Sequence, residues 1–244
     1  MKNYKMVLAY DGTRYNGWQK QGNTENTIQE KLERILQEIS GAETEVFGSG
    51  RTDAGTHATG QVMNFHINWN GTAEQLLDAF NAKLPEDIAA LSIAEMPPRF
   101  HSRLSAKAKH YSYSIWIGKH SPVFERKYTF RCTETLDVQA MRQAAAAFIG
   151  THDFKSFCAN KRMKKSTVRT IYDIVFEETE DKLTLHFYGN GFLPDGAHPY
   201  GNAHRGWRGE EKRRRSRADF TGKKPRAGRL YGTQPRTFFV RGIL

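Results

Sequence analysis

Two kinds of hydrophobic periodicity alternate along residues 1–98. Strand-like runs, clearest where every second residue is large and apolar, occupy residues 4–10, 44–47, 61–67 and 88–94. Between them, residues 27–39 and 72–80 carry apolar side chains at the spacing of an amphipathic helix. Both helical runs begin with a threonine followed three residues later by Glu or Gln, as in a capping box. The predicted order is β-α-β-β-α-β, which is typical of a ferredoxin-like fold.

A second pattern starts after Met96-Pro97-Pro98, which we interpret as a linker. Residues 111–115 alternate as a strand, Asp137 caps a helix that Gly150 ends, and two further strands form a hairpin over 168–177 and 182–189. A second α-β pair does not follow. The predicted class is α+β, with two ferredoxin-like halves at 1–98 and 99–193, the second incomplete after Leu193.

Residues 194–244 form a basic tail without steady apolar periodicity. They contain 13 Lys and Arg against 4 Asp and Glu, whereas residues 1–193 contain 24 against 22. The net charge of +11 indicates a nucleic-acid partner, but most of it lies in this tail. The abundance of Gly, Arg and Pro predicts a disordered or loosely structured segment.

One loop stands out as a candidate functional site. Residues 48–62 contain four glycines, so the backbone can turn tightly or approach a ligand closely. Arg51 and Asp53 bring a cation and an anion to this loop. It has two interpretations, a substrate-binding loop and a tight surface turn in which Asp53 hydrogen-bonds its own backbone.

The remaining features of the chain narrow its class. No apolar run is long enough for a membrane span, and the N-terminus is not that of a signal peptide, so we expect a soluble, cytoplasmic protein. Cys132 and Cys158 match no metal-ligand spacing and suggest a reducing compartment, with a single disulfide as the alternative.

Six motifs, in order, resemble those of the tRNA pseudouridine synthases that modify the anticodon stem-loop. The most specific is Ser49-Gly50-Arg51-Thr52-Asp53-Ala54-Gly55 with His57-Ala58 and Gly60-Gln61-Val62. The others are Tyr10-Asp11-Gly12-Thr13 with Gly17-Trp18-Gln19, Thr27-Ile28-Gln29, Arg99-Phe100-His101 with Lys109, Tyr111 and Tyr113, Gly150-Thr151-His152-Asp153-Phe154, and Gly189-Asn190-Gly191-Phe192-Leu193.

The resemblance implies a fold and a reaction. Two ferredoxin-like halves would flank a central basic, RNA-binding cleft, and the enzyme would isomerise uridines 38, 39 and 40 of tRNA to pseudouridine. Uracil leaves C1′ of the sugar and is reattached through its C5, so no redox cofactor or metal is required. The family also implies a tRNA partner and a homodimer.

The resemblance assigns roles to three residues. Asp53 would be the nucleophile, attacking either C1′ of the sugar or C6 of the base. Tyr111 would stack on the extruded base, with a core strand aromatic as the alternative. Arg51 would fill the space left in the stem or hold a phosphate, with a solvated turn arginine as the alternative.

The tail departs from the family after Leu193. The family has an apolar helix there, with an arginine that keeps the catalytic carboxylate charged. Residues 194–200 read Pro-Asp-Gly-Ala-His-Pro-Tyr instead. Read one base later, permitted codons for 194–211 and 228–243 give strings that resemble the missing helix and a closing strand. We therefore expect a frameshifted C-terminus, poor folding after Leu193 and impaired activity.

A second function class remains open beside the enzyme. The +9 tail and the missing arginine also fit a non-catalytic RNA-binding protein with an Arg-rich tail. Binding through backbone phosphates would then depend strongly on salt.

Overall fold

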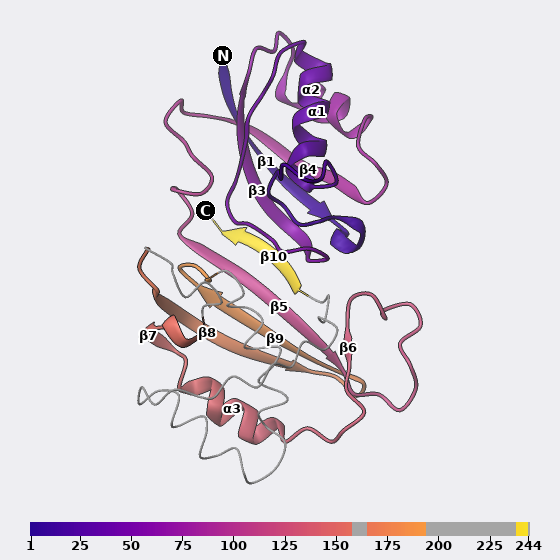
Figure 1. Cartoon of the computed structure of the whole chain (residues 1–244), viewed down its shortest axis with the longest axis vertical. Coiled ribbons are helices and arrows are strands. Elements are labelled where there is room, and N and C mark those ends of the chain that lie inside the picture. The colour runs from indigo at the N-terminus through magenta and orange to yellow at the C-terminus, as the bar shows by residue number, and fades with distance from the viewer. Residues whose placement is uncertain (158–164, 194–237, 244) are drawn as a thin grey trace. The chain divides into compact units, whose positions relative to one another are not determined.

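The computed structural model describes residues 1–157, 165–193 and 238–243 (Figure 1). It contains two compact units, Met1–His110 with Arg236–Leu244, and Tyr111–Pro235. The predicted domain boundaries remain predictions: 1–98, 99–193 and 194–244. Most of residues 194–244 lie outside the described residues, and so does Cys158.

The first unit is a mixed sheet with two helices against it (Figure 1). Its elements are β1 (Lys2–Tyr10), a 3-10 turn (Gly12–Arg14), α1 (Ile28–Ser40), β2 (Val46–Gly48), β3 (His57–Ile67), α2 (Ala73–Asn81), β4 (Ile88–Met96) and β10 (Phe238–Ile243). Strand β1 lies between β4 and β3, antiparallel to both. Strand β2 pairs antiparallel with β3, and β10 pairs parallel with it. The predicted β-α-β-β-α-β order of residues 1–98 is present.

The core of this unit forms where one face of the sheet meets the helices. Tyr4 and Met6 of β1 lie opposite Phe65 and Met63 of β3, and none is more than 1% exposed. The helices contribute their apolar stripes to the same core, with Leu32, Leu36, Leu76 and Phe80 fully buried. This burial confirms the predicted alternation and helical spacing.

Both helices begin where the sequence predicts. The Thr72 hydroxyl accepts from the Gln75 amide, and the Gln75 side chain accepts from the Thr72 amide, which completes a capping box. At α1, Thr27 accepts from the Glu30 amide, which is half of that arrangement. Gly41 ends α1 in the left-handed region, at φ 74°.

The opposite face of the sheet is covered by residues 97–105. The Asn3 side-chain amide donates to the Phe100 carbonyl at 2.9 Å, and the Asn64 oxygen accepts from the Ser102 amide at 2.9 Å. Asn3, Asn64 and Ser102 are at most 2% exposed. The alternation in β3 predicts a polar face at Asn64, and that face is buried because these side chains hydrogen-bond the covering segment.

The second unit is a smaller sheet with one helix. Its elements are β5 (Ala108–Trp116), β6 (Phe130–Arg131), α3 (Val138–Ala146), β7 (Gly150–Asp153), a 3-10 turn (Lys155–Phe157), β8 (Val168–Glu178) and β9 (Lys182–Gly189). The strand order is β5-β9-β8-β7, with β6 beside β5. The hairpin of β8 and β9 is as predicted.

Two features of this unit differ from the sequence prediction. Helix α3 ends at Ala146, because the chain turns at 147–149, and Gly150 opens β7 at φ 105° instead of ending the helix. Strand β7 is held by its pairing with β8, from Gly150 opposite Ile171 to Asp153 opposite Val168. A four-residue strand has too little pattern to be seen in sequence.

Strand β10 lies in the tail for which the sequence predicts no regular structure. The rest of that tail, 194–237 and 244, lies outside the described residues. Among the helices that the structure describes, none has the length and apolar character to cross a membrane.

Candidate active site

The glycine-rich loop predicted to carry the chemistry is shorter than its sequence signature. Strand β3 begins at His57, so only 49–56 connect β2 to β3, and the glycine at position 60 belongs to the strand. The predicted loop 48–62 was too long because glycines were taken as loop residues throughout. The correction confines Arg51 and Asp53 to eight residues between two paired strands.

The start of this loop is fastened to β3 by buried polar groups. The Ser49 hydroxyl donates to the Gln61 side-chain oxygen at 2.8 Å. The Gln61 side-chain nitrogen donates to the Gly50 carbonyl at 2.8 Å. The Ser49 amide donates to the Val62 carbonyl at 2.7 Å. Because Ser49 and Gln61 are at most 1% exposed, these bonds are shielded from competing water.

Thr52 holds the middle of the loop against the first segment of the chain. Its hydroxyl lies 2.9 Å from the Tyr10 phenol oxygen, and its carbonyl accepts from the Trp18 amide at 2.9 Å. Burial raises the pKa of Tyr10 above its usual value, so the phenol stays protonated. Thr52 is buried, whereas Arg51 and Asp53 on either side of it are exposed. Fixing one residue inward therefore turns the cation and the anion outward.

Glycines allow this close approach. A Cβ on Gly12 would lie 1.9 Å from the Thr56 carbonyl oxygen, and one on Gly17 would lie 2.6 Å from the Thr52 carbonyl oxygen. Gly55 has φ 77°, and its amide donates to the Tyr15 carbonyl at 3.2 Å. The segment 10–18 can lie directly on the loop because no side chain separates them.

His57 joins the end of the loop to the same segment. Its ring is fully buried, its Nδ1 accepts from the Gly12 amide at 3.2 Å, and the Asp11 carboxylate lies 3.0 Å from that nitrogen. The Thr13 amide donates to the Asp11 carboxylate at 2.9 Å, which fixes the orientation of that carboxylate. His57 is therefore a positioning residue at the point where the loop enters β3.

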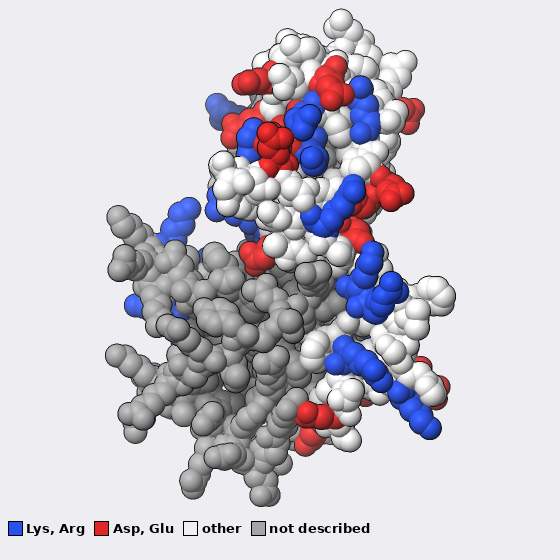
Figure 2. Space-filling model, turned by 45° about the vertical axis from the view of Figure 1, so that its right-hand side comes forward, with Lys and Arg blue, Asp and Glu red and all other residues white. Residues whose placement is uncertain are grey.

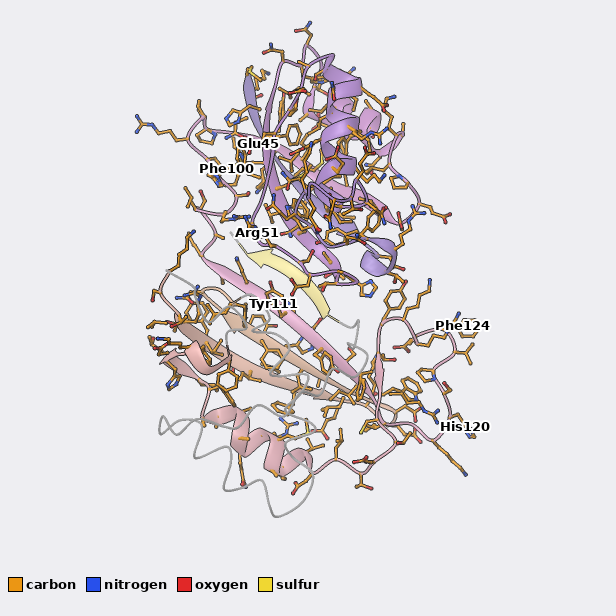
Figure 3. All side chains as sticks on the ribbon, in the orientation of Figure 1. Glu45, Arg51, Phe100, Tyr111, His120 and Phe124 are labelled. Atoms are coloured by element: carbon orange, nitrogen blue, oxygen red, sulfur yellow. The ribbon has the colours of Figure 1, made fainter. Side chains whose placement is uncertain are left out.

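A second arginine lies beside the loop. Partial burial lowers the pKa of Arg103, and the positive charge of Arg51 lowers it further, so the two guanidinium groups are close enough to repel. Both lie in the first unit (Arg51 is labelled in Figure 3). Arg103 follows Ser102, whose amide bond to Asn64 fixes this segment on the sheet. Two neighbouring cations beside an exposed carboxylate favour a phosphate-bearing ligand.

Tyr111 belongs to the second unit, whereas Asp53 belongs to the first. It lies on β5, is 9% exposed, and meets the Phe192 ring edge-on with centroids 4.6 Å apart. The loop thus brings together Arg51 and Asp53 of the three predicted site residues. The burial of Tyr111 fits its alternative interpretation, a core strand aromatic.

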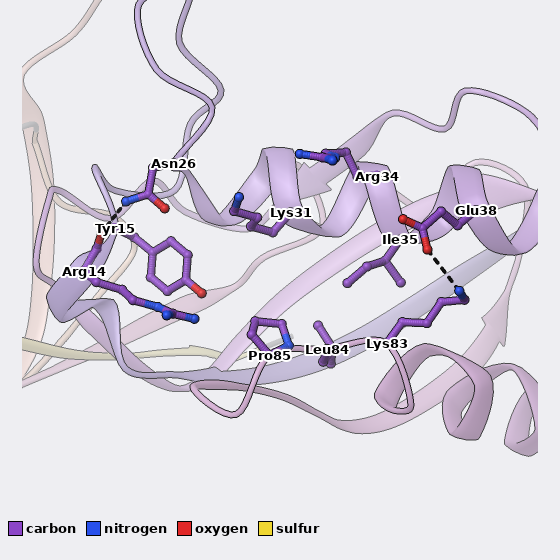
Figure 4. A pocket seen from close by; sticks show the side chains of 10 residues that line it. All are labelled: Arg14, Tyr15, Asn26, Lys31, Arg34, Ile35, Glu38, Lys83, Leu84 and Pro85. Carbon is purple, nitrogen blue, oxygen red and sulfur yellow. Dashed lines mark hydrogen bonds and ion pairs between the residues drawn. The ribbon is translucent and has the colours of Figure 1, made fainter.

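A groove of about 460 Å³ lies elsewhere on the first unit, between α1 and residues 83–85 (Figure 4). Three of its cations are matched by carboxylates: Arg14 binds Asp87, Lys83 binds Glu38 at 2.9 Å, and Arg34 lies 3.7 Å from Glu25. Figure 2 likewise shows acidic and basic side chains interleaved over this unit. The groove contains none of the three predicted site residues.

Sequence reasoning missed the residues that position the loop. Tyr10, Thr52, His57 and Arg103 were not predicted to act, although the first three belong to motifs on which the resemblance depends. The alternation of exposed Arg51, buried Thr52 and exposed Asp53 was a signal that could have identified Thr52. Within the described residues, no group of three or more His, Cys, Asp or Glu could hold a metal ion.

Comparison with known proteins tests the family that the motifs resemble. The family model described as tRNA pseudouridine synthase matches residues 6–104 and 144–219. The chain is 43% identical to tRNA pseudouridine synthase A of Bacillus sp. (strain KSM-64) and 46% identical to tRNA pseudouridine synthase A 1 of Clostridium tetani. It is 42% identical to tRNA pseudouridine synthase A 2 of Bacillus anthracis.

Each of these alignments spans 193 residues, 79% of both chains, so about a fifth of each lies outside. Among solved structures, a chain of a Cbf5-Nop10-Gar1 complex matches at 12% identity, with a TM-score of 0.37, over 81% of this chain and 44% of that one. That likeness is too distant to carry an argument. The family match and the close relatives agree with the motifs around Asp53, and the chain belongs to the tRNA pseudouridine synthases, a family of isomerases.

Proposed function

We propose that this chain converts uridines 38, 39 and 40 in the anticodon stem-loop of tRNA to pseudouridine, with Asp53 as the nucleophile. The observation that carries the proposal is the inward attachment of Thr52, which leaves the Asp53 carboxylate exposed on a braced loop. A nucleophile must be reachable by substrate and yet held in one position.

The reaction needs no group from outside the chain. The bond from C1′ to N1 of uracil breaks, the base turns, and a bond from C1′ to C5 forms. N1 gains a proton and C5 loses one, so no atom is lost and the product is an isomer. Asp53 can attack either C1′ or C6, and both routes hold the substrate while the base turns.

We assign supporting roles to Arg51 and Tyr111. Arg51, with Arg103 beside it, would hold a backbone phosphate or fill the space that the extruded base leaves. Tyr111 would stack on that base, and Tyr111→Phe against Tyr111→Ala tests the role. If the ring is a platform, Phe keeps substrate affinity and Ala loses it.

The fold of this proposal is two ferredoxin-like halves. It is supported in the first unit by the strand order β4-β1-β3-β2, with both crossovers made by helices. We further propose that the protein is cytoplasmic and forms a homodimer, and sedimentation of the purified chain tests the homodimer.

The nucleophile is tested with an unmodified tRNA transcript. Pseudouridine formed in a single turnover is compared between wild type, Asp53→Ala and a control, Asp78→Ala. The control removes an exposed carboxylate from helix α2. We expect product from wild type and the control, and none from Asp53→Ala. Equal product from all three would remove Asp53 from the mechanism.

We also propose that activity is reduced in the chain as written, because residues 194–200 lack the arginine expected after Leu193. Sequencing the gene tests the frameshift origin, and codons that give no Met-Val-Arg string one base out of register would refute it. A frame-corrected protein should turn over faster, and equal rates would show that the arginine is dispensable.

The +9 tail supports a second candidate, a non-catalytic RNA-binding protein. Salt-dependent tRNA binding without any product, in both the wild-type and the frame-corrected protein, would favour it. A chain ending at Leu193 that keeps full affinity and the same salt slope would exclude a role for the tail.

A further inference from the structure

An exposed aromatic side chain lies on the turn of residues 117–129, which connects β5 to β6. Phe124 is 92% exposed and its neighbour Val123 is 58% exposed. Figure 3 labels Phe124 and His120, and both point away from the ribbon of this turn. A phenylalanine so far from other atoms forgoes the burial that usually stabilises it, and its ring face is open to stacking by a ligand.

The turn itself is built and does not depend on Phe124. The Trp116 indole donates to the His120 carbonyl at 2.7 Å. At the other end, the Glu125 carbonyl accepts from the Tyr128 amide at 2.8 Å and from the Thr129 hydroxyl at 3.0 Å. Phe124 lies between these anchors, so its ring is presented from a fixed backbone.

The charge around the ring is positive. Lys119, Arg126 and Lys127 are exposed. The one carboxylate within the turn, Glu125, is paired with Lys182 at 3.0 Å. A further carboxylate, Asp181, lies against the turn at Gly118, but the three exposed cations outnumber it. The charge beside Phe124 therefore favours an anionic ligand, and a second copy of this basic turn would be repelled.

We propose that Phe124 is a stacking platform for an unpaired base of the RNA substrate, with Arg126 and Lys127 binding the adjacent phosphates. An aromatic ring among cations is the usual way in which proteins bind single-stranded nucleotides. The inference rests on the proposed tRNA substrate. It adds a contact outside the residues matched by the family, since that match stops at 104 and resumes at 144.

Equilibrium binding of a tRNA transcript tests the platform. Phe124→Ala should weaken binding about 5- to 140-fold, as the loss of one stacked base worth about 1–3 kcal/mol requires. Phe124→Trp should keep the wild-type affinity for tRNA, because a larger ring stacks at least as well. The matched control is Leu91→Ala, which removes another exposed apolar side chain, 52% exposed, from β4 in the first unit.

The cations are tested by salt dependence. Arg126→Ala with Lys127→Ala should reduce the slope of log affinity against log salt by about 1.4 to 1.8, as two lost phosphate contacts require. A perfectly paired RNA duplex should bind wild type and Phe124→Ala alike, because it has no unpaired base to stack.

A photoreactive benzoylphenylalanine at position 124 identifies the occupant. A cross-link to an unpaired tRNA nucleotide supports the proposal, while a cross-link to a second copy of the chain, or none, overturns it. Equal tRNA affinity of wild type and Phe124→Ala also overturns it, and leaves the proposed function intact if Asp53-dependent product still forms. Failure of wild type to bind tRNA would overturn both.

Discussion

Replacing Gly12 by alanine tests whether the segment 10–18 sets the position of the active-site loop. The new Cβ would lie 1.9 Å from the Thr56 carbonyl oxygen, and an ordinary contact begins at 3.4 Å. The two backbones must therefore separate by about 1.5 Å, and neither is a flexible side chain that can turn away. The bond from the Gly12 amide to His57 lies at the same contact and should be lost.

Two magnitudes follow from that displacement. Forcing an extra methyl into a packed site costs about 1–3 kcal/mol of unfolding free energy. A displacement near 1 Å of a catalytic group costs about 100-fold in rate. We expect Gly12→Ala to lower both the rate and the unfolding free energy by these amounts. The rate is measured as single-turnover pseudouridine formation, and the stability by urea unfolding.

Gly22→Ala is the matched control, because a Cβ at that glycine would have nothing within 4 Å. It should keep the wild-type rate and stability. Hydrogen exchange supplies a third readout, since the Trp18 amide is protected by its bond to the Thr52 carbonyl. A Gly12→Ala protein with wild-type rate, stability and Trp18 protection would refute the view that this contact positions the loop.

Three further predictions follow from the same unit. Tyr10→Phe leaves the buried Thr52 hydroxyl without its phenol partner and should lower the unfolding free energy in urea by about 1–3 kcal/mol. If the losses of Tyr10→Phe and Thr52→Val simply add up in the double variant, the hydrogen bond does not stabilise the fold. Burial and the bond to Asp87 raise the pKa of Tyr15 to about 12. The contribution of Tyr15 to the unfolding free energy is therefore complete below pH 10 and is lost between pH 10 and about 12. Tyr15→Phe should flatten this fall in the pH profile of unfolding free energy, and an unchanged profile would contradict the prediction. Arg103→Ala should lower the salt slope of tRNA binding by about 1, and an unchanged slope would show that it contacts no phosphate.

The first unit could be predicted from sequence because its signals are local. A threonine with Gln75 three residues later is enough to predict the start of α2, and alternation over residues 4–10 is enough to identify β1. The buried Asn64 could not be predicted, since its partner Ser102 lies 38 residues away. Partners brought together only by the folded chain leave no periodic signal.

The candidate site shows the same division. The motif resemblance identified Asp53 and Arg51, and the structure adds why they face outward, through Thr52. The start of β3 at His57 depends on pairing with β1 and β10, which glycine content does not reveal. Gly150 was assigned to a helix end because glycine also serves there, whereas pairing with β8 recruits it into a strand.

Strand β10 makes the first unit discontinuous along the chain. It pairs in parallel with β3 at residues 57–60, immediately after the active-site loop, although all of Tyr111–Pro235 lies between them in sequence. During synthesis, the first unit must wait without this strand until the whole second unit has left the ribosome. Such long-range pairing forms late and slowly, and until then the β3 edge is open to other strands. A nascent chain stalled before Arg236 should therefore be more prone to aggregation than the finished protein.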